Sequence, residues 1–288
     1  MDDALADGEE DEDDEGGCEF VVAEGDDLGW LGYFVGKCEV LEELYIYYLP
    51  EGGDQINRFF EGMSQNRSLK TLNILYDIEV GVDGWSRLGG FFENNCNLSN
   101  FELVPHSQII GNESAQNLAL ALGQMNHNFL TDLRICNNDI SDEGMTEIAA
   151  ALGSQSQLET LFLCENNNVG RNSCVALGNT LSRWPASNKL ETLRIGNNAI
   201  DDEGLQALVA GMMNCCSLKR LNLSNNQSIT AAGFISLSPL LQSESNCLET
   251  LHLCRIDFGD DGAIALAEGL RGNTSLKELW LSPETSGI

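Results

Sequence analysis

One short pattern recurs nine times along this chain of 288 residues, and it constrains the fold more than any other feature. The pattern is L-x-x-L-x-L with minor substitutions, and successive copies start 28, 29, 32, 28, 32, 28, 30 and 28 residues apart. The copies begin at Leu41, Leu69, Leu98, Leu130, Leu158, Leu190, Leu218, Leu248 and Leu276. A unit this short cannot bury its own apolar faces, so the regular spacing predicts stacked units that share one core.

Each unit predicts a short strand followed by a helix. The fourth and sixth positions, Leu133 and Ile135 in one copy, alternate with polar residues as in a half-buried strand. An Asn-rich turn follows in the later units, and Asn side chains bond to backbone groups where a chain bends; these turns are at 137–138, 166–167, 197–198 and 225–226. Ser141 and Asp201 are then suited to cap the following helices.

Neighbouring strands lie about 4.8 Å apart and packed helices about 8–10 Å apart, so the stack is expected to curve toward its strands. These repeats resemble the leucine-rich repeat family, and the 28–29-residue alternation with a full helix is similar to its ribonuclease-inhibitor-like class. The resemblance covers about residues 18–288. It implies an α/β solenoid, a horseshoe with a parallel sheet on its concave face and helices on its convex face. A binding scaffold is implied, but no particular function.

The chain divides into three expected parts. Residues 1–17 carry an acidic run without a base and predict a disordered tail. Residues 18–40 fit a degenerate N-terminal cap repeat, with a strand near Glu19–Val22 and a helix near Asp27–Gly36, and residues 41–288 form the array. Extra residues predict loops at Pro105–Ile110 and Arg183–Asn188. No helix follows Leu281, which predicts either a longer array or a subunit covering the last edge.

Charge limits the expected partners. Lys and Arg number 15 against 45 Asp and Glu, a formal charge of −30, which argues against nucleic acid and anionic membrane surfaces. Solubility and mutual repulsion between copies are the plainer interpretation of this charge, and a basic protein partner is the functional alternative. Because Met1–Gly16 has no apolar signal region and no long apolar run exists, we expect a cytoplasmic or nuclear protein, not a secreted one. Its ten cysteines are then expected to be reduced.

A partner surface is expected on the concave face, to which strand alternation turns the third, fifth and seventh positions of each unit. Phe162 is expected between Arg134 and Arg194 of the adjacent strands, with a cation above each side of its ring. The candidate partner-binding residues are Tyr45, Tyr47, Arg134, Phe162, Arg194, Asn222, His252 and Trp280. Two alternatives stay open: a surface ladder satisfied within the chain, and packing of Trp280 beneath a further unit.

Catalytic and cofactor motifs are absent from the sequence. It contains no phosphate-binding loop, no G-x-S-x-G, no H-E-x-x-H and no C-x-x-C, so no enzyme activity, cofactor or metal is predicted. The acidic run at 11–16 does not complete a calcium loop, because Val22 stands where a bidentate Glu is needed. Cys136 and Cys164 share the seventh position of adjacent strands and are expected near each other, although small half-buried residues are the plainer interpretation.

Three hypotheses about function follow. The first is a non-catalytic scaffold that binds a protein partner. The second is an activator of a small GTPase, since some proteins with this long repeat have that activity and an acidic segment, although theirs follows the repeats. The third is the sensor part of a larger multidomain receptor, suggested by the open last edge. The partner and the oligomeric state stay open.

Overall fold

The computed structural model describes residues 27–47, 53–75, 80–104, 111–125, 129–153, 157–166, 168–243, 245 and 247–282. Within these ranges helix and strand alternate along the chain. The helices are α1 Leu28–Lys37, α2 Gly53–Met63, α3 Val82–Asn94, α4 Asn112–Gln124, α5 Asp142–Ala151, α6 Arg171–Arg183, α7 Asp202–Met212, α8 Ala231–Gln242 and α9 Gly259–Leu270. The strands are β1 Glu43–Ile46, β2 Thr71–Leu75, β3 Asn100–Val104, β4 Asp132–Ile135, β5 Thr160–Phe162, β6 Thr192–Arg194, β7 Arg220–Asn222, β8 Thr250–His252 and β9 Glu278–Trp280.

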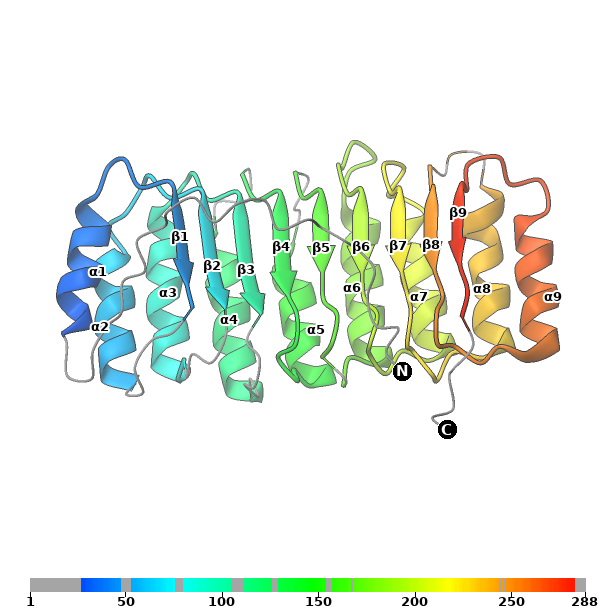
Figure 1. Ribbon diagram of the computed structural model, residues 1–288, viewed down its shortest axis with the longest axis horizontal. Helices are drawn as coiled ribbons and strands as arrows, with labels where there is room; N and C mark the ends of the chain where they lie inside the picture. Colours follow the sequence, from blue (N-terminus) through cyan, green and yellow to red (C-terminus); the bar gives the residue numbers. More distant parts are fainter. Residues whose placement is uncertain are drawn as a thin grey trace, which may run out of the picture.

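The described strands form one parallel sheet in the order β1 to β9, so each strand pairs with the next one along the chain. The helices form a second layer behind this sheet (Figure 1). Equivalent positions of neighbouring units stand opposite each other, as where Arg134 pairs with Phe162 and Phe162 pairs with Arg194. The predicted α/β repeat solenoid is therefore confirmed.

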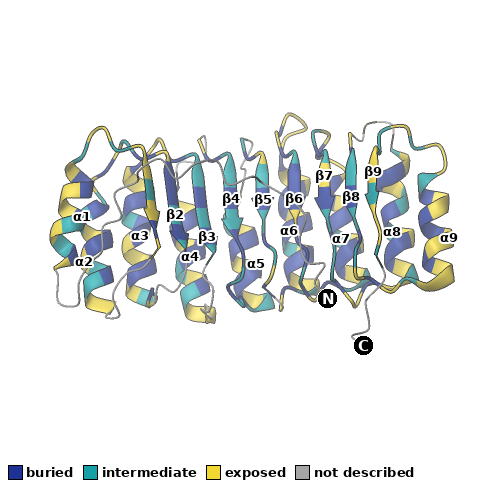
Figure 2. Cartoon of the chain, in the orientation of Figure 1, coloured by how far each residue is buried: buried dark blue, intermediate teal, exposed yellow. Residues whose placement is uncertain are grey.

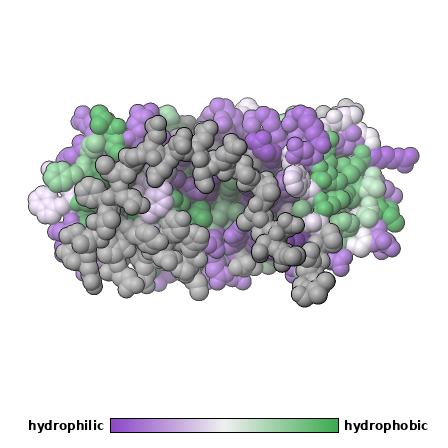
Figure 3. Space-filling model, viewed as in Figure 1, coloured by the Kyte–Doolittle hydropathy of each residue, from purple (hydrophilic) through white to green (hydrophobic). Residues whose placement is uncertain are grey.

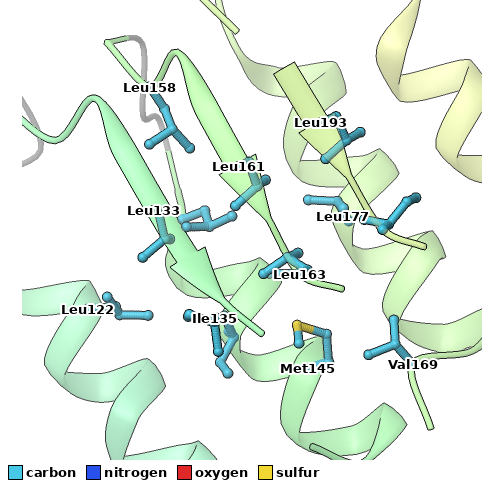
Figure 4. Close-up of a cluster of buried hydrophobic side chains, with 14 of the residues drawn as sticks. Leu122, Leu133, Ile135, Met145, Leu158, Leu161, Leu163, Val169, Leu177 and Leu193 are labelled. Atoms are coloured by element: carbon cyan, nitrogen blue, oxygen red, sulfur yellow. The ribbon is translucent and has the colours of Figure 1, made fainter. Parts of the chain in front are cut away.

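The core lies between the two layers and runs through the whole array. Figure 4 shows Leu133 and Ile135 of β4 beside Leu161 and Leu163 of the next unit, with Met145 of α5 beneath them. All five of these side chains are buried. The helices are buried along the side facing the sheet and exposed along their other sides (Figure 2). The shared core that the fourth and sixth positions predicted is thus present.

Buried asparagines close the turn after the strand in four consecutive units. Asn166 Nδ2 donates to the carbonyls of Ile135, Leu163 and Cys164 at 3.0–3.2 Å. Its Oδ1 accepts from the backbone N–H of Asn138 at 3.3 Å, and Asn166 N donates in turn to Asn198 Oδ1 at 3.2 Å. The four asparagines are Asn138, Asn166, Asn198 and Asn226. They form a ladder, here called the asparagine ladder, that satisfies backbone groups between successive units.

The turn prediction needs one adjustment in the fifth unit. There the ladder residue is Asn166 and the residue before it is Glu165, with a left-handed φ of 58°, matching Asn137 at 59° and Asn197 at 54°. Asn167 is therefore one place beyond the equivalent position, and it lies outside the described residues. Leu49, Asp77 and His106 stand at the equivalent position of the sequence in the first three units, and they also lie outside the described residues.

Other expectations can be compared only in part. The helix expected at Asp27–Gly36 is α1 at Leu28–Lys37, with Asp27 as its N-cap. The expected loop at Arg183–Asn188 is a turn held in place, because Trp184 is buried and its Nε1 donates to Gly153 O at 2.8 Å. The tail at 1–17, the strand at Glu19–Val22 and the loop at Pro105–Ile110 lie outside the described residues.

Helix capping works within units and between them. Ser141 Oγ accepts from Gly144 N at 3.1 Å and Asp201 Oδ1 from Gly204 N at 2.8 Å, so both predicted N-caps are confirmed. In addition, Asp142 at the start of α5 accepts from the N-terminus of the next helix, α6. Its carboxylate receives the backbone N–H groups of 170, 172 and 173 at 2.9–3.2 Å, and the Ser173 hydroxyl. Burial alone would raise the pKa of Asp142, but these hydrogen bonds outweigh burial and lower that pKa.

Replacing Asp142 with Ala is expected to lower the free energy of unfolding by about 1–2 kcal/mol at neutral pH, because the N-terminus of α6 loses its charged acceptor. The pKa of Asp142 is lower in the folded chain than in the unfolded chain, so this stabilisation is present above the unfolded pKa. It is lost as pH falls through the folded pKa. Urea unfolding from neutral to acidic pH should show the difference from wild type closing in acid. Glu147→Ala, on the exposed side of α5, is the matched control, and a pH-independent difference would contradict the assignment.

Candidate functional site

The candidate site lies on the side of the sheet away from the helices, here called the sheet face. Strand register aligns the fifth positions of all nine units into one line across it, here called the central column. The central column reads Tyr45, Asn73, Glu102, Arg134, Phe162, Arg194, Asn222, His252 and Trp280. Each of these side chains is half-buried or exposed, so the line is available for contact along its length.

An aromatic ring held between two guanidinium groups marks the middle of the central column. The guanidinium carbon of Arg134 lies 4.8 Å from the ring centroid of Phe162, and that of Arg194 lies 4.6 Å from it. The arrangement is the one expected from the sequence, because in-register parallel strands bring equivalent positions side by side. Each contact contributes about 0.5–1 kcal/mol at an exposed site.

The two arginines differ in their other partners. Arg134 makes a two-point contact with Asp132 on its own strand, at 2.9 and 3.0 Å. Arg194 forms no salt bridge within the described ranges, and its side chain is exposed. The outer edge of Arg194 therefore presents guanidinium donors that are not used by an ion pair in this part of the chain.

Aromatic residues lie at both ends of the central column. His252 and Trp280 are stacked with ring centroids 5.2 Å apart and planes 4° apart, and Trp280 is 49% exposed. At the other end, the Tyr45 hydroxyl donates to Glu43 Oε2 at 3.1 Å. Tyr47, two residues further along the chain, is also exposed. Partial burial and the Glu43 carboxylate raise the pKa of Tyr45. Figure 3 shows an apolar area at the β9 end of this view.

The structure groups the eight predicted residues unevenly. Arg134 and Arg194 each contact Phe162, and His252 contacts Trp280. Asn222 stands between these two groups, and its Oδ1 accepts from Ser224 N at 2.9 Å. Tyr45 and Tyr47 are separated from the Phe162 group by two intervening strands.

Two polar contacts on the face were not anticipated from the sequence. Asn73 Nδ2 donates to Glu102 Oε2 at 2.8 Å, and Arg134 bonds to Asp132 as described above. Burial raises the pKa of Glu102, while the nearby Arg134 opposes that rise. The signal for the second contact was present, because an acid two residues before an Arg on one strand faces the same side.

Charges on the sheet face are nearly balanced although the chain is strongly acidic. The third-position and fifth-position columns together hold the acids Glu43, Glu102, Asp132 and Glu278 and the bases Arg134, Arg194 and Arg220. Hydrophilic residues gather instead along the edge where strands begin, as Figure 3 shows for the visible part. Across the described residues, no three His, Cys, Asp or Glu side chains gather in a way that would hold a metal ion. None of the described helices combines the length and apolarity required to cross a bilayer.

Comparison with known proteins agrees with this geometry. Family models for the leucine-rich repeat match residues 126–149, 186–209, 214–238 and 247–265. The chain is 31% identical over 222 residues to the NACHT, LRR and PYD domains-containing protein 12 of Mus musculus, covering 75% of this chain and 20% of that protein. It is 30% identical over 220 residues to the ribonuclease inhibitor of Sus scrofa, covering 75% of this chain and 46% of that protein.

The chain therefore spans less than half the length of either relative. The matches extend across most of the array described above, and they include a protein of the class that the repeat length predicted. Nine in-register parallel strands, each followed or preceded by a helix in the described residues, have the architecture of that class. The chain belongs to the leucine-rich repeat family, in its ribonuclease-inhibitor-like class.

Proposed function

We propose that this chain is a non-catalytic interaction scaffold whose sheet face binds a protein partner. The observation that carries the proposal is the Phe162 ring held between Arg134 and Arg194 at the middle of an accessible central column. Aromatic and Arg side chains at the centre of a face are the types that contribute most binding energy at protein interfaces. Nine strands about 4.8 Å apart also extend about 40 Å, which suits a macromolecule better than a metabolite.

The partner is proposed to place a carboxylate against Arg194. The guanidinium of Arg194 is fixed from one side by Phe162, so less side-chain entropy is lost when its free edge binds. Arg and a carboxylate form two parallel hydrogen bonds when the geometry allows. The near balance of charge on the sheet face supports selection by such contacts rather than by a generally basic partner.

A reducing compartment is proposed for the protein. The nine described cysteines are free thiols, including two that lie in contact. Free thiols persist in cytoplasm and nucleus, where disulfides are kept reduced. This supports the cytoplasmic or nuclear location expected from the sequence.

The function is tested by capture from cytosolic extract on immobilised chain. We expect wild type and Ile235→Ala, which alters an exposed side chain on α8, to retain the same protein. Arg134→Ala and Arg194→Ala should retain much less of it, because each removes one side of the Phe162 stack. A protein retained equally by all four chains, or none retained by any, would contradict binding at the sheet face.

A second candidate is the repeat region of a larger multidomain receptor. One observation favours it: several relatives are named for NACHT and PYD domains beside their repeats, and the chain matches about a fifth of their length. Sequencing the full transcript tests this directly. An open reading frame that joins these repeats to a NACHT or PYD domain supports the candidate, and a frame holding repeats alone rejects it.

A further inference from the structure

Two thiols meet on the sheet face beside the Phe162 stack. The Sγ atoms of Cys136 and Cys164 lie 2.7 Å apart. Both residues follow their strands by the same step, two places beyond the paired residues Arg134 and Phe162. A backbone hydrogen bond from Asn137 N to Cys164 O at 3.2 Å joins the two units beside the thiols, and Cys136 N donates to Leu103 O of the preceding unit at 3.1 Å.

The arrangement is specific to this pair of units. Cys254 occupies the same position after β8, but the equivalent residues on either side of it are Ser224 and Ser282. Cys254 therefore has the same place in its unit without a thiol at the equivalent place in a neighbouring unit. This makes Cys254 an internal comparison for anything that depends on two thiols in contact.

The two thiols of the pair have different surroundings. Cys136 is 7% exposed, whereas Cys164 is half-buried and lies nearer solvent. The hydrogen bond between the two thiols, in which either sulfur can donate, lowers the pKa of Cys164, and the nearby Arg194 adds to this lowering against the effect of burial and of Glu165. The same hydrogen bond, together with burial, raises the pKa of Cys136. Cys164 is thus the better nucleophile, because the thiolate is the reactive form.

We propose that Cys136 and Cys164 form an oxidation site that hydrogen peroxide converts to a disulfide. In the first step Cys164 Sγ attacks one peroxide oxygen. An S–O bond forms, the O–O bond breaks, and the leaving oxygen takes up a proton as water. In the second step Cys136 Sγ attacks the Cys164 sulfenic acid, an S–S bond forms, and the hydroxyl leaves with the Cys136 proton as a second water. Two thiols are oxidised for each peroxide reduced.

The fold accommodates the product with little movement. A disulfide bond is about 2.05 Å long, so the two sulfurs have to approach by less than about 1 Å. Adjacent parallel strands lie about 4.8 Å apart, which is within the range of about 4.4–6.8 Å that disulfides span between Cα atoms. The inference stands on this contact and does not depend on the proposed function.

Peptide mass analysis of the peroxide-treated full chain tests the proposal. Residues 135–170 contain neither Lys nor Arg, so trypsin releases both cysteines in one peptide that ends at Arg171. The reduced chain is treated with graded hydrogen peroxide, quenched with catalase, unfolded, alkylated and digested. We expect this peptide to lose both alkylation sites and two hydrogens at peroxide doses that leave Cys96, Cys216 and Cys247 alkylated. Glu147 lies between the two cysteines. Further cleavage after Glu147 should therefore leave the fragment with Cys136 joined by the disulfide to the fragment with Cys164 until a reductant is added.

Variants separate the two roles. Cys254→Ser should oxidise at the same dose as wild type. Cys136→Ser should stop at a Cys164 sulfenic acid that dimedone traps, and Cys164→Ser should leave Cys136 open to alkylation after unfolding. The proposal is overturned if the exposed cysteines oxidise first, or if Cys164 joins a different cysteine or another chain. The wild-type digest decides between these results even where a variant fails to fold.

Discussion

Replacing Asn166 with Ala is expected to lower the free energy of unfolding by about 3 kcal/mol or more. The side chain is fully buried and joins its own turn to the preceding unit, because its Nδ2 donates to Ile135 O and its Oδ1 accepts from Asn138 N. Truncation leaves several backbone groups without partners in the core, and each such group costs about 1–3 kcal/mol. Asn166 lies near the middle of the array, so the loss weakens the junction between the fourth and fifth units.

Urea unfolding measures this effect. Asn168→Ala is a close control, because Asn168 is exposed and its side-chain amide donates to Asp139 Oδ1 on the surface. That control is expected to change stability by less than about 0.5 kcal/mol. If Asn166→Ala unfolds within that same margin of wild type, the asparagine ladder is not a main source of stability.

Replacing Phe162 with Ala is expected to weaken binding of the captured partner by about 30-fold or more in Kd, equivalent to about 2 kcal/mol. The ring supplies apolar contact area and also positions both guanidinium groups. Truncation therefore removes that apolar area together with the contacts to Arg134 and Arg194. Phe162 is half-buried on the sheet face and is not part of the core. The thermal midpoint of the variant should therefore stay close to that of wild type.

Calorimetric titration of partner into each variant makes this comparison. Arg194→Lys keeps the charge but loses the planar group that stacks on the ring, so we expect an intermediate loss. Ile235→Ala on α8 should bind as wild type does. Equal affinity of Phe162→Ala and wild type for the partner would contradict binding at the central column.

The regular unit length made much of the fold predictable from sequence. Because equal units stack in register, any residue lies beside its equivalent about 28–32 positions away. That relation alone predicted the contacts of Phe162 with Arg134 and Arg194, and the approach of Cys136 to Cys164. The helix caps Ser141 and Asp201 followed from local chemistry.

A second set of asparagines, of which two are buried and one is half-buried, was missed, although its signal is present in the sequence. In three units an Asn stands three residues before the first Leu of the strand pattern: Asn66, Asn95 and Asn273. Each accepts from the backbone N–H of that Leu at 2.8–2.9 Å. Each also donates to a carbonyl of the preceding unit, to Val35, Leu69 and Leu241 respectively. The motif is short and polar, so it resembles an ordinary turn until the stacking is known.

Contacts between unlike positions could not be predicted from spacing. Asp142 caps the helix of the next unit, and this depends on how the N-termini of α5 and α6 are offset in the second layer. For Arg134 the spacing indicates that Asp132 faces the same side, but the choice of Asp132 over Glu102 depends on side-chain rotamers. Repeat length fixes which strands are neighbours but does not fix these choices, because they follow from local packing.

Oxidative footprinting of the chain with its captured partner tests the central claim most directly. Hydroxyl radicals label exposed aromatic side chains, and mass analysis reports each one separately. We expect Phe162 and Trp280 on the sheet face to lose labelling in the complex, while Trp30 on α1, which is 64% exposed, keeps its labelling. Protection of Trp30 with unchanged labelling of Phe162 and Trp280 would contradict binding at the sheet face.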